Sequence, residues 1–129
     1  MNIEEYNLIQ NKENKHQIAI DFDGVIHSNS KGFFDGTVYD DPIPGSINAI
    51  KELSKTYEIV IFTAKVKPDR PLVNNKTGKE LIWEWFDKYN ISSYIKEITC
   101  EKPRAIAYID DKAIRFEDWD TTLEILNNA

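Results

Sequence analysis

The chain contains short continuous runs of apolar residues that alternate with segments in which apolar residues recur every three or four positions. Continuous apolar runs are typical of strands buried on both faces, as in a parallel sheet. They predict strands at 17–21, 58–62 and 105–109. A further strand is expected at 94–99, and the start of a short fifth at 114–116. Only about five residues would join the third and fourth strands, whereas a connection between parallel strands usually needs a dozen or more.

Helical periodicity follows several of these strands. Residues 46–55 carry an apolar stripe, and Thr77 and Glu80 match the capping box that opens a second helix. Asp118 or Asp120 is expected to cap a last helix. The residues expected to face the core are Ile82, Trp85, Phe86 and Tyr89 in the second helix and Leu123, Ile125 and Leu126 in the last. Strands that alternate with helices predict an α/β fold with a mainly parallel sheet.

The length of 129 residues suits a single domain. Residues 1–16 are polar and contain several asparagines, so we expect an arm or a short helix there. Residues 17–129 are expected to form the one domain. Glycines and prolines interrupt residues 27–44, which predicts a flap after the first strand, with a small hairpin around 33–39.

Polar residues that can bind a metal ion or a phosphate follow or precede these strands. Asp21 and Asp23 directly follow the first apolar run, and Gly24 then lets the chain turn sharply. The further groups are Thr63 after the second strand, Lys102 before the fourth, and Asp110 and Asp111 after it. Ligands of open parallel sheets bind beyond the carboxyl ends of the strands, so we expect these residues to converge. Such a cluster could hold a divalent cation and leave one carboxylate free to attack.

The order of these groups resembles the four motifs of the haloacid dehalogenase superfamily of phosphotransferases. The resemblance runs from about Gln17 to Trp119 and implies a three-layer α/β/α, Rossmann-like fold. Members of this superfamily often carry a cap domain after the first or second motif. Here 39 residues separate Asp23 from Thr63 and 38 separate Thr63 from Lys102, which implies a small capless member with a short flap. A lysine shortly upstream of the acidic pair is also similar to deoxyribonucleotidase-like members.

The resemblance implies a role for each motif residue. Asp21 would be the nucleophile that forms an aspartyl-phosphate, and Asp23 would protonate the leaving group and later deprotonate water. Thr63 would donate a hydrogen bond to a phosphoryl oxygen, and Lys102 would offset negative charge in the transition state. The residues expected to complete the substrate site are Gly24, Ala64 and Lys65.

A metal ion belongs to this chemistry, because a carboxylate cannot approach a phosphate dianion unless a cation screens the charge. Mg²⁺ suits the hard oxygen ligands that the chain offers. The residues expected to hold it are Asp21, Asp23 through its backbone carbonyl, Asp110 and Asp111. Which of the last two binds the ion directly stays open, with Asp111 slightly preferred.

The sequence therefore predicts an Mg²⁺-dependent phosphatase whose small phosphorylated substrate is a nucleotide or a sugar phosphate. Phe33, Phe34 and Tyr39 could stack on a base or a sugar, or could simply pack the flap onto the body. His27 is expected to be a loop residue that could line the entrance of the site. A polynucleotide 3′-phosphatase, or a non-catalytic module that binds a phosphorylated ligand, are the alternatives.

Composition narrows the choice of partners. Sixteen basic and 22 acidic residues give a net charge of −6, which argues against nucleic acid or an anionic membrane. Nucleic acid stays an alternative partner because the sequence also contains a local basic patch. Its residues are Lys65, Lys67, Arg70, Lys76 and Lys79. A single cysteine, no signal-peptide pattern and no apolar run near the ~18 residues of a membrane span predict a cytoplasmic protein. The sequence also does not decide whether the protein forms a homo-oligomer in which a second copy closes the site.

Overall fold

The computed structural model describes residues 16–101, 105, 107–110 and 114–128, so the predicted arm at 1–16 lies almost wholly outside it. In chain order the elements are β1 (His16–Asp21), α2 (Ser46–Leu53), β2 (Tyr57–Phe62), the 3₁₀ helix η1 (Ala64–Val66), α3 (Gly78–Lys88), the 3₁₀ helix η2 (Ser92–Tyr94), β3 (Ile95–Thr99), β4 (Ala107–Asp110), β5 (Ile114–Arg115) and α4 (Trp119–Asn127). The strand bounds differ from the predicted ones by one or two residues.

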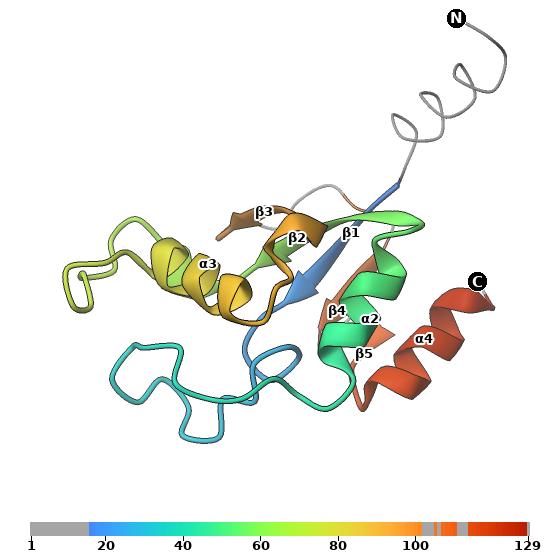
Figure 1. Ribbon diagram of the computed structural model, residues 1–129, viewed down its shortest axis with the longest axis horizontal. Coiled ribbons are helices and arrows are strands. Elements are labelled where there is room, and N and C mark those ends of the chain that lie inside the picture. The colour runs from blue at the N-terminus through green and yellow to red at the C-terminus, as the bar shows by residue number, and fades with distance from the viewer. Residues whose placement is uncertain (1–15, 102–104, 106, 111–113, 129) are drawn as a thin grey trace, which may run out of the picture.

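All five strands run parallel in one sheet, in the order β3-β2-β1-β4-β5 (Figure 1). The central strand is β1, in which Ile20 aligns with Ile61 of β2 and with Ile109 of β4. The order of the strands therefore reverses between β1 and β4, and ligands of open α/β sheets bind at such a point. The all-parallel sheet flanked by helices confirms the predicted α/β, Rossmann-like fold without a cap domain.

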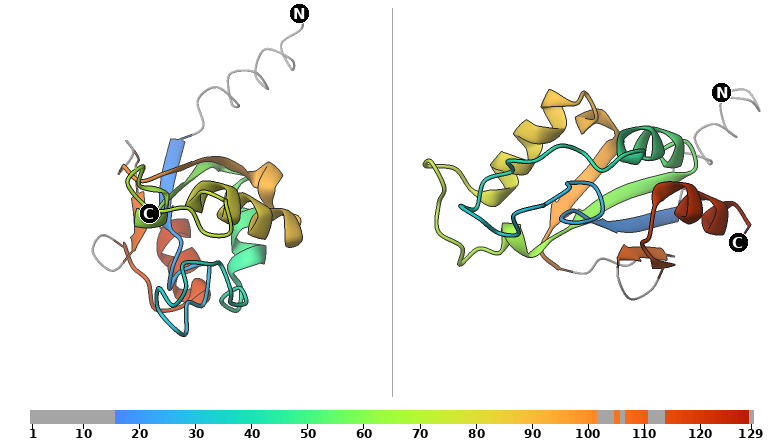
Figure 2. Two further views of the ribbon diagram at one scale, coloured as in Figure 1. Left: turned by 90° about the vertical axis from the view of Figure 1, so that its left-hand side faces the viewer. Right: turned by 90° about the horizontal axis from the view of Figure 1, so that it is seen from below.

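The hydrophobic core lies between one face of the sheet and helices α2, α3 and α4 (Figure 2). Ile18 and Ile20 of β1 are fully buried there, as is Phe86 of α3. Ala19 and Val60 alternate with these core residues along their strands and are fully buried as well, so β1 and β2 are covered on both faces. Burial of one such isoleucine or phenylalanine contributes about 1.5–3 kcal/mol.

Local capping determines where two of the helices begin. The predicted box at α3 is confirmed, because Thr77 Oγ1 accepts the Glu80 N–H at 3.1 Å and the Glu80 carboxylate accepts the Thr77 N–H at 3.3 Å. Asp118 caps α4 by accepting a backbone N–H at 2.7 Å, and this hydrogen bond lowers the pKa of Asp118. The prediction for Ile125 was wrong. It is 45% exposed, whereas Leu126 is buried, because only one side of α4 meets the core.

Residues 28–41 form turns and bends, so the predicted hairpin at 33–39 is wrong. At their centre Gly32, Phe34 and Gly36 have φ angles of 64°, 50° and 83°. Extended strands need negative φ angles, so these three residues interrupt any pairing of the segment with itself. The flap is therefore an irregular loop that reaches over the carboxyl edge of the sheet (Figure 1).

Candidate active site

Three of the predicted motif segments reach the same edge of the sheet. Asp21 is the last residue of β1 and aligns with Phe62, the last residue of β2, so Thr63 follows at that edge. Asp110 ends the neighbouring strand β4, and the residue before it aligns with the residue before Asp21. The backbones of Asp21 and Asp110 therefore lie side by side at the point where the strand order reverses.

Two predicted residues, Lys102 and Asp111, lie outside the described part of the chain. For Asp110 the structure describes the backbone and its place in β4. The placement of Lys102 depends on the connection from β3 to β4, which consists of residues 100–106. The roles given to these side chains therefore stay predictions.

Backbone hydrogen bonds fold the residues after β1 into a tight turn. The carbonyl of Phe22 accepts the N–H groups of Ile26 and His27 at 2.9 and 3.0 Å, and the Gly24 N–H donates to the His27 carbonyl at 2.8 Å. Gly24 has a φ of 80°, which a residue with a Cβ adopts only at a cost. The turn that the sequence predicted after Asp23 is therefore present.

One open pocket at this edge is lined by the two acidic residues of the first motif. Asp21 and Asp23 share it with Gly24, Val25 and Phe116. Asp21 Oδ1 accepts the following backbone N–H at 2.8 Å. Carboxylate and carbonyl oxygens suit Mg²⁺, so the donors at this pocket fit the predicted ion. Among the described residues, no three Asp, Glu, His or Cys side chains gather into a metal site by themselves.

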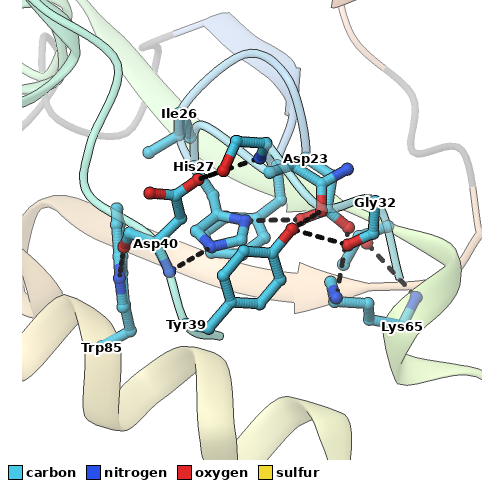
Figure 3. A network of polar contacts seen from close by, with 12 residues as sticks. Asp23, Ile26, His27, Gly32, Tyr39, Asp40, Lys65 and Trp85 are labelled. Carbon is cyan, nitrogen blue, oxygen red and sulfur yellow. Dashed lines mark hydrogen bonds and ion pairs between the residues drawn. The ribbon is translucent and has the colours of Figure 1, made fainter. Parts of the chain in front are cut away.

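His27 is fully buried and contacts the carboxylate of Asp23 (Figure 3). Its Nδ1 lies 2.9 Å from Asp23 Oδ1, and its Nε2 accepts the backbone N–H of Asp40 at 3.0 Å. Because Nε2 is an acceptor, the proton of the neutral imidazole lies on Nδ1 and is donated to Asp23. His27 lies in a loop, as expected, but the alternative that it lines the entrance does not hold, because its side chain is fully buried. The signal in the sequence was its position directly after the apolar pair Val25 and Ile26.

Aromatic side chains enclose the imidazole at the base of the flap. The Phe22 ring stacks on His27 with centroids 5.3 Å apart and an interplanar angle of 1°. Tyr39 and Trp85 make T-shaped contacts with His27 at 5.2 and 5.7 Å. Trp85 Nε1 also donates to the carbonyl of Asp40 at 3.0 Å (Figure 3). His27, Tyr39, Asp40 and Trp85 are named the flap root below.

The side chain of Asp40 ties the start of the flap to its end. Its Oδ2 accepts the Ser30 hydroxyl at 2.6 Å and the Ser30 N–H at 2.9 Å, and its Oδ1 accepts the Asp41 N–H at 2.9 Å. These donors, the Ser30 hydroxyl above all, lower the pKa of Asp40 from 3.8 to about 2. Asp40 is therefore ionised at neutral pH, which keeps the flap closed on itself.

Thr63 and Lys65 bring hydrogen-bond donors to the same edge. Thr63 is 6% exposed and caps η1 by accepting the Lys65 N–H at 3.2 Å, which leaves its hydroxyl hydrogen to donate elsewhere. The ammonium of Lys65, a residue only 8% exposed, lies 3.5 Å from Asp23 Oδ2 and forms no hydrogen bond with the described residues. Ala64, between them, is exposed at the start of η1.

A second surface pocket lies at the opposite edge of the sheet, where β2 and β3 begin. Tyr57, Glu58, Tyr94 and Lys96 are among its lining residues. The ammonium of Lys96 there is already engaged by Glu58 at 2.9 Å and by the side-chain oxygen of Gln17 at 3.0 Å. Because the charges of Lys96 and Glu58 in this pocket neutralise one another, we place the candidate site at the carboxyl edge instead.

Comparison of the chain with models of protein families, with curated proteins and with solved structures gave no match. No helix within the described ranges has both the length and the apolar character needed to cross a membrane. What the site can do therefore follows from its own residues and geometry.

Proposed function

We propose that this protein is an Mg²⁺-dependent phosphatase that hydrolyses a phosphomonoester, a nucleotide or a sugar phosphate, through an aspartyl-phosphate on Asp21. The observation that carries the proposal is the shared pocket of Asp21 and Asp23. Within it, Asp23 lies between a hydrogen bond from His27 and the ammonium of Lys65. A covalent phosphatase needs this combination of a nucleophile with an acid–base group and a cationic donor beside it.

The reaction has two steps. A carboxylate oxygen of Asp21 attacks the phosphorus, and the ester bond breaks with its electron pair going to the leaving oxygen, which takes a proton from Asp23. Asp23 then takes a proton from a water molecule, whose oxygen attacks the phosphorus and displaces the carboxylate of Asp21. An alcohol and inorganic phosphate leave, and both aspartates return to their starting states.

The neighbours of Asp23 determine which of its two oxygens exchanges the proton. The Nδ1–H of His27 engages Oδ1, so Oδ2 is the oxygen that exchanges the proton. Lys65 lies 3.5 Å from Oδ2 and can turn to a phosphoryl oxygen when the substrate binds, which releases Oδ2 for proton transfer. The hydroxyl of Thr63 can donate to another phosphoryl oxygen.

When bound, Mg²⁺ would screen the negative charge of the phosphate from the acidic residues around it. The residues that would hold it are Asp21, Asp23 through its carbonyl, Asp110 and Asp111. Lys102 keeps its predicted role of offsetting charge in the transition state. EDTA should therefore stop turnover, and added Mg²⁺ should restore it.

Asp21→Asn tests the covalent step. Turnover of an aryl phosphate with Mg²⁺ should fall at least about 1,000-fold, because a neutral amide is a poor nucleophile. Asp41→Asn makes the same charge change on an exposed residue of the flap and should retain turnover. Circular dichroism of both variants checks that the fold is intact. Activity retained by Asp21→Asn would refute the mechanism, and a wild-type protein inactive on a broad panel would point to the non-catalytic module.

Asp23→Asn separates the two steps. With an ester that has a good leaving group, Asp21 should still be phosphorylated, because departure then needs no proton. Hydrolysis of the aspartyl-phosphate should slow by about 10²–10⁴-fold, since the base is missing. The intact mass of the protein after rapid quenching measures the phosphorylated fraction. If no phosphorylated protein accumulates, Asp23 has a different role.

A further inference from the structure

The flap tip, residues 31–36, presents two aromatic side chains to solvent. Phe33 is 55% exposed and Phe34 is 59% exposed. Phe34 also has a φ of 50°, a left-handed conformation that a bulky residue rarely adopts. Backbone strain of this kind gathers at functional sites, where a ligand gains from the arrangement. The tip therefore has the character of a contact surface.

Two cationic side chains converge on the Phe33 ring. The ammonium of Lys65 lies 5.5 Å from the ring centroid, and the guanidinium carbon of Arg70 lies 5.6 Å from it. The same ammonium lies 3.5 Å from Asp23. Phe33 is thus one side chain away from the proposed acid–base residue.

The ammonium of Lys65 is short of acceptors. Lys65 is more than nine-tenths buried, and its Nζ makes no hydrogen bond within the part of the chain that the structure describes. Burying an ammonium is costly unless acceptors satisfy its three donors. A phosphate in the pocket of Asp21 and Asp23 would supply them. Lys65 therefore indicates that an anionic group of the ligand binds next to Phe33.

Positive charge continues beyond the ring. Phe33, Lys65 and Arg70 line a small cavity between the flap tip and the loop after η1. Arg70 also lines the neighbouring groove, together with Lys67 and Lys79. A ligand that extends past Phe33 would meet these cations, so a second phosphate beyond the ring would also be bound favourably.

We propose that Phe33, Lys65 and Arg70 form a subsite for the nucleoside part of a nucleotide whose phosphate occupies the pocket of Asp21 and Asp23. The base stacks on the exposed Phe33 ring, and Lys65 donates to the phosphate. The position of the phosphate rests on the proposed function. A sugar phosphate has no aromatic base to stack on Phe33, so this subsite selects between the two substrate classes left open above. A free nucleotide and the phosphorylated end of a single strand share this chemistry.

Phe34 provides a matched control. It neighbours Phe33, has the same side chain and has almost the same exposure. Its ring instead has the ammonium of Lys31 at 4.6 Å and a T-shaped contact with Tyr39 at 5.6 Å. Phe34→Leu therefore removes an exposed aromatic ring without touching the cations beside Asp23.

Equilibrium binding with Ca²⁺ in place of Mg²⁺ tests the subsite without fast turnover, because Ca²⁺ still screens the carboxylates but takes a larger and less rigid coordination shell. Isothermal titration calorimetry compares adenosine monophosphate with ribose 5-phosphate, which is the same molecule without its base. Adenosine monophosphate should bind about tenfold more tightly, as expected for stacking of one base on an aromatic side chain. Phe33→Leu should abolish this difference, and Phe34→Leu should preserve it. Ribose 5-phosphate should bind all three proteins equally.

A short oligoadenylate with a terminal phosphate distinguishes the two sources of the nucleotide. If the ligand is a strand end, Arg70→Gln and Lys79→Gln should weaken oligoadenylate binding more than adenosine monophosphate binding. They should also lower its dependence on salt concentration, because each removes a phosphate contact. Equal weakening of both ligands assigns the subsite to a free nucleotide.

Equal affinities of the wild-type protein for adenosine monophosphate and ribose 5-phosphate would overturn the proposal. So would equal losses in Phe33→Leu and Phe34→Leu. Binding is measured independently of turnover, so the two proposals fail separately. An inactive protein with Phe33-dependent binding would refute only the phosphatase, and an active protein without that dependence would refute only the subsite.

Discussion

The two parts of the flap are built in opposite ways, although they belong to one short loop. In the flap root, His27 is fully buried and is hydrogen-bonded on both sides, to Asp23 and to the backbone of Asp40. In the flap tip, Phe33 and Phe34 are more than half exposed, and long cationic side chains lie over their rings. The root can hold a reacting carboxylate in one position, while the tip stays accessible to a ligand.

This contrast predicts that substitutions in the root change kcat, whereas substitutions in the tip change the affinity for the ligand. Groups with few buried contacts open at low cost in free energy, whereas buried hydrogen-bonded groups open only with the surrounding structure. Lys65 lies between the two regions, because its ammonium contacts Phe33 of the tip and Asp23, the carboxylate that His27 of the root holds. Variants of the root, of the support of Lys65 and of the tip should therefore give different kinetic signatures.

Among variants of the flap and its supports, the largest effect is expected for His27→Leu. Leucine cannot donate to Asp23, so the carboxylate loses its fixed orientation, and the Asp40 N–H loses its acceptor. Removing a supporting group of this kind typically lowers activity by about 10–100-fold. The loss should appear in kcat for an aryl phosphate, with KM little changed, because the flap tip is intact. A loss confined to KM would contradict the division between root and tip.

Two conservative variants separate the two bonds of His27. His27→Asn keeps a donor near the position of Nδ1 but loses the acceptor for Asp40, and His27→Gln does the reverse. If the orientation of Asp23 matters most, His27→Asn should retain more turnover than His27→Gln, although both lose stability. The opposite order would mean that His27 acts through Asp40 and the flap.

Gly78→Ala tests the position of Lys65. Helix propensity alone favours alanine by up to about 1 kcal/mol. However, a Cβ on Gly78 would lie 2.0 Å from the backbone carbonyl oxygen of Lys65, which cannot rotate away. Overpacking of this kind costs about 1–3 kcal/mol, so we expect a net loss of stability in urea unfolding and weaker phosphate binding. Lys79→Ala, in the same helix turn but exposed, is the control and should change stability by less than about 0.5 kcal/mol.

Trp85→Phe should have a smaller effect on the root. Phenylalanine keeps most of the ring but cannot donate to the Asp40 carbonyl, which Trp85 Nε1 reaches at 3.0 Å. A lost hydrogen bond that leaves a partly buried carbonyl unpaired costs about 1–2 kcal/mol. Urea unfolding measures this cost. Trp83→Phe, on the same helix but outside the root, is the matched control, and an equal loss in both variants would show that ring size alone matters.

The fold could be predicted because it depends on local patterns. The continuous apolar runs of β1 and β2 indicated strands buried on both faces, and Ala19 and Val60 are buried accordingly. The capping box of Thr77 needed only a glutamate three residues later. Convergence of Asp21 with the end of β4 followed from the parallel topology, which brings all carboxyl ends to one edge.

The flap root could not be predicted, because its contacts join residues that are far apart in the chain. Trp85 lies 45 residues after Asp40, whose carbonyl it binds. From the sequence, His27 resembles an ordinary polar loop residue. Its burial depends on packing against the ring of Phe22. Lysine is rarely buried, so nothing local indicated that Lys65 lies inside the protein. Tertiary packing, which the sequence pattern does not specify, decided all three positions.

The smallest effect is expected from the charge of Asp40. Its pKa is lowered from 3.8 to about 2, chiefly by the Ser30 hydroxyl. A group with a lowered pKa in the folded state stabilises the fold above its unfolded value, and this contribution is lost as the pH falls through the folded value. The thermal unfolding temperature of the wild-type protein should therefore be higher than that of Asp40→Asn at about pH 5. The difference between the two temperatures should disappear as the pH falls toward about 2. Asp41→Asn, which leaves the acceptor of Ser30 in place, should show no such closing gap. A difference for Asp40→Asn that stays constant across this range would mean that the ionised carboxylate does not tie the flap.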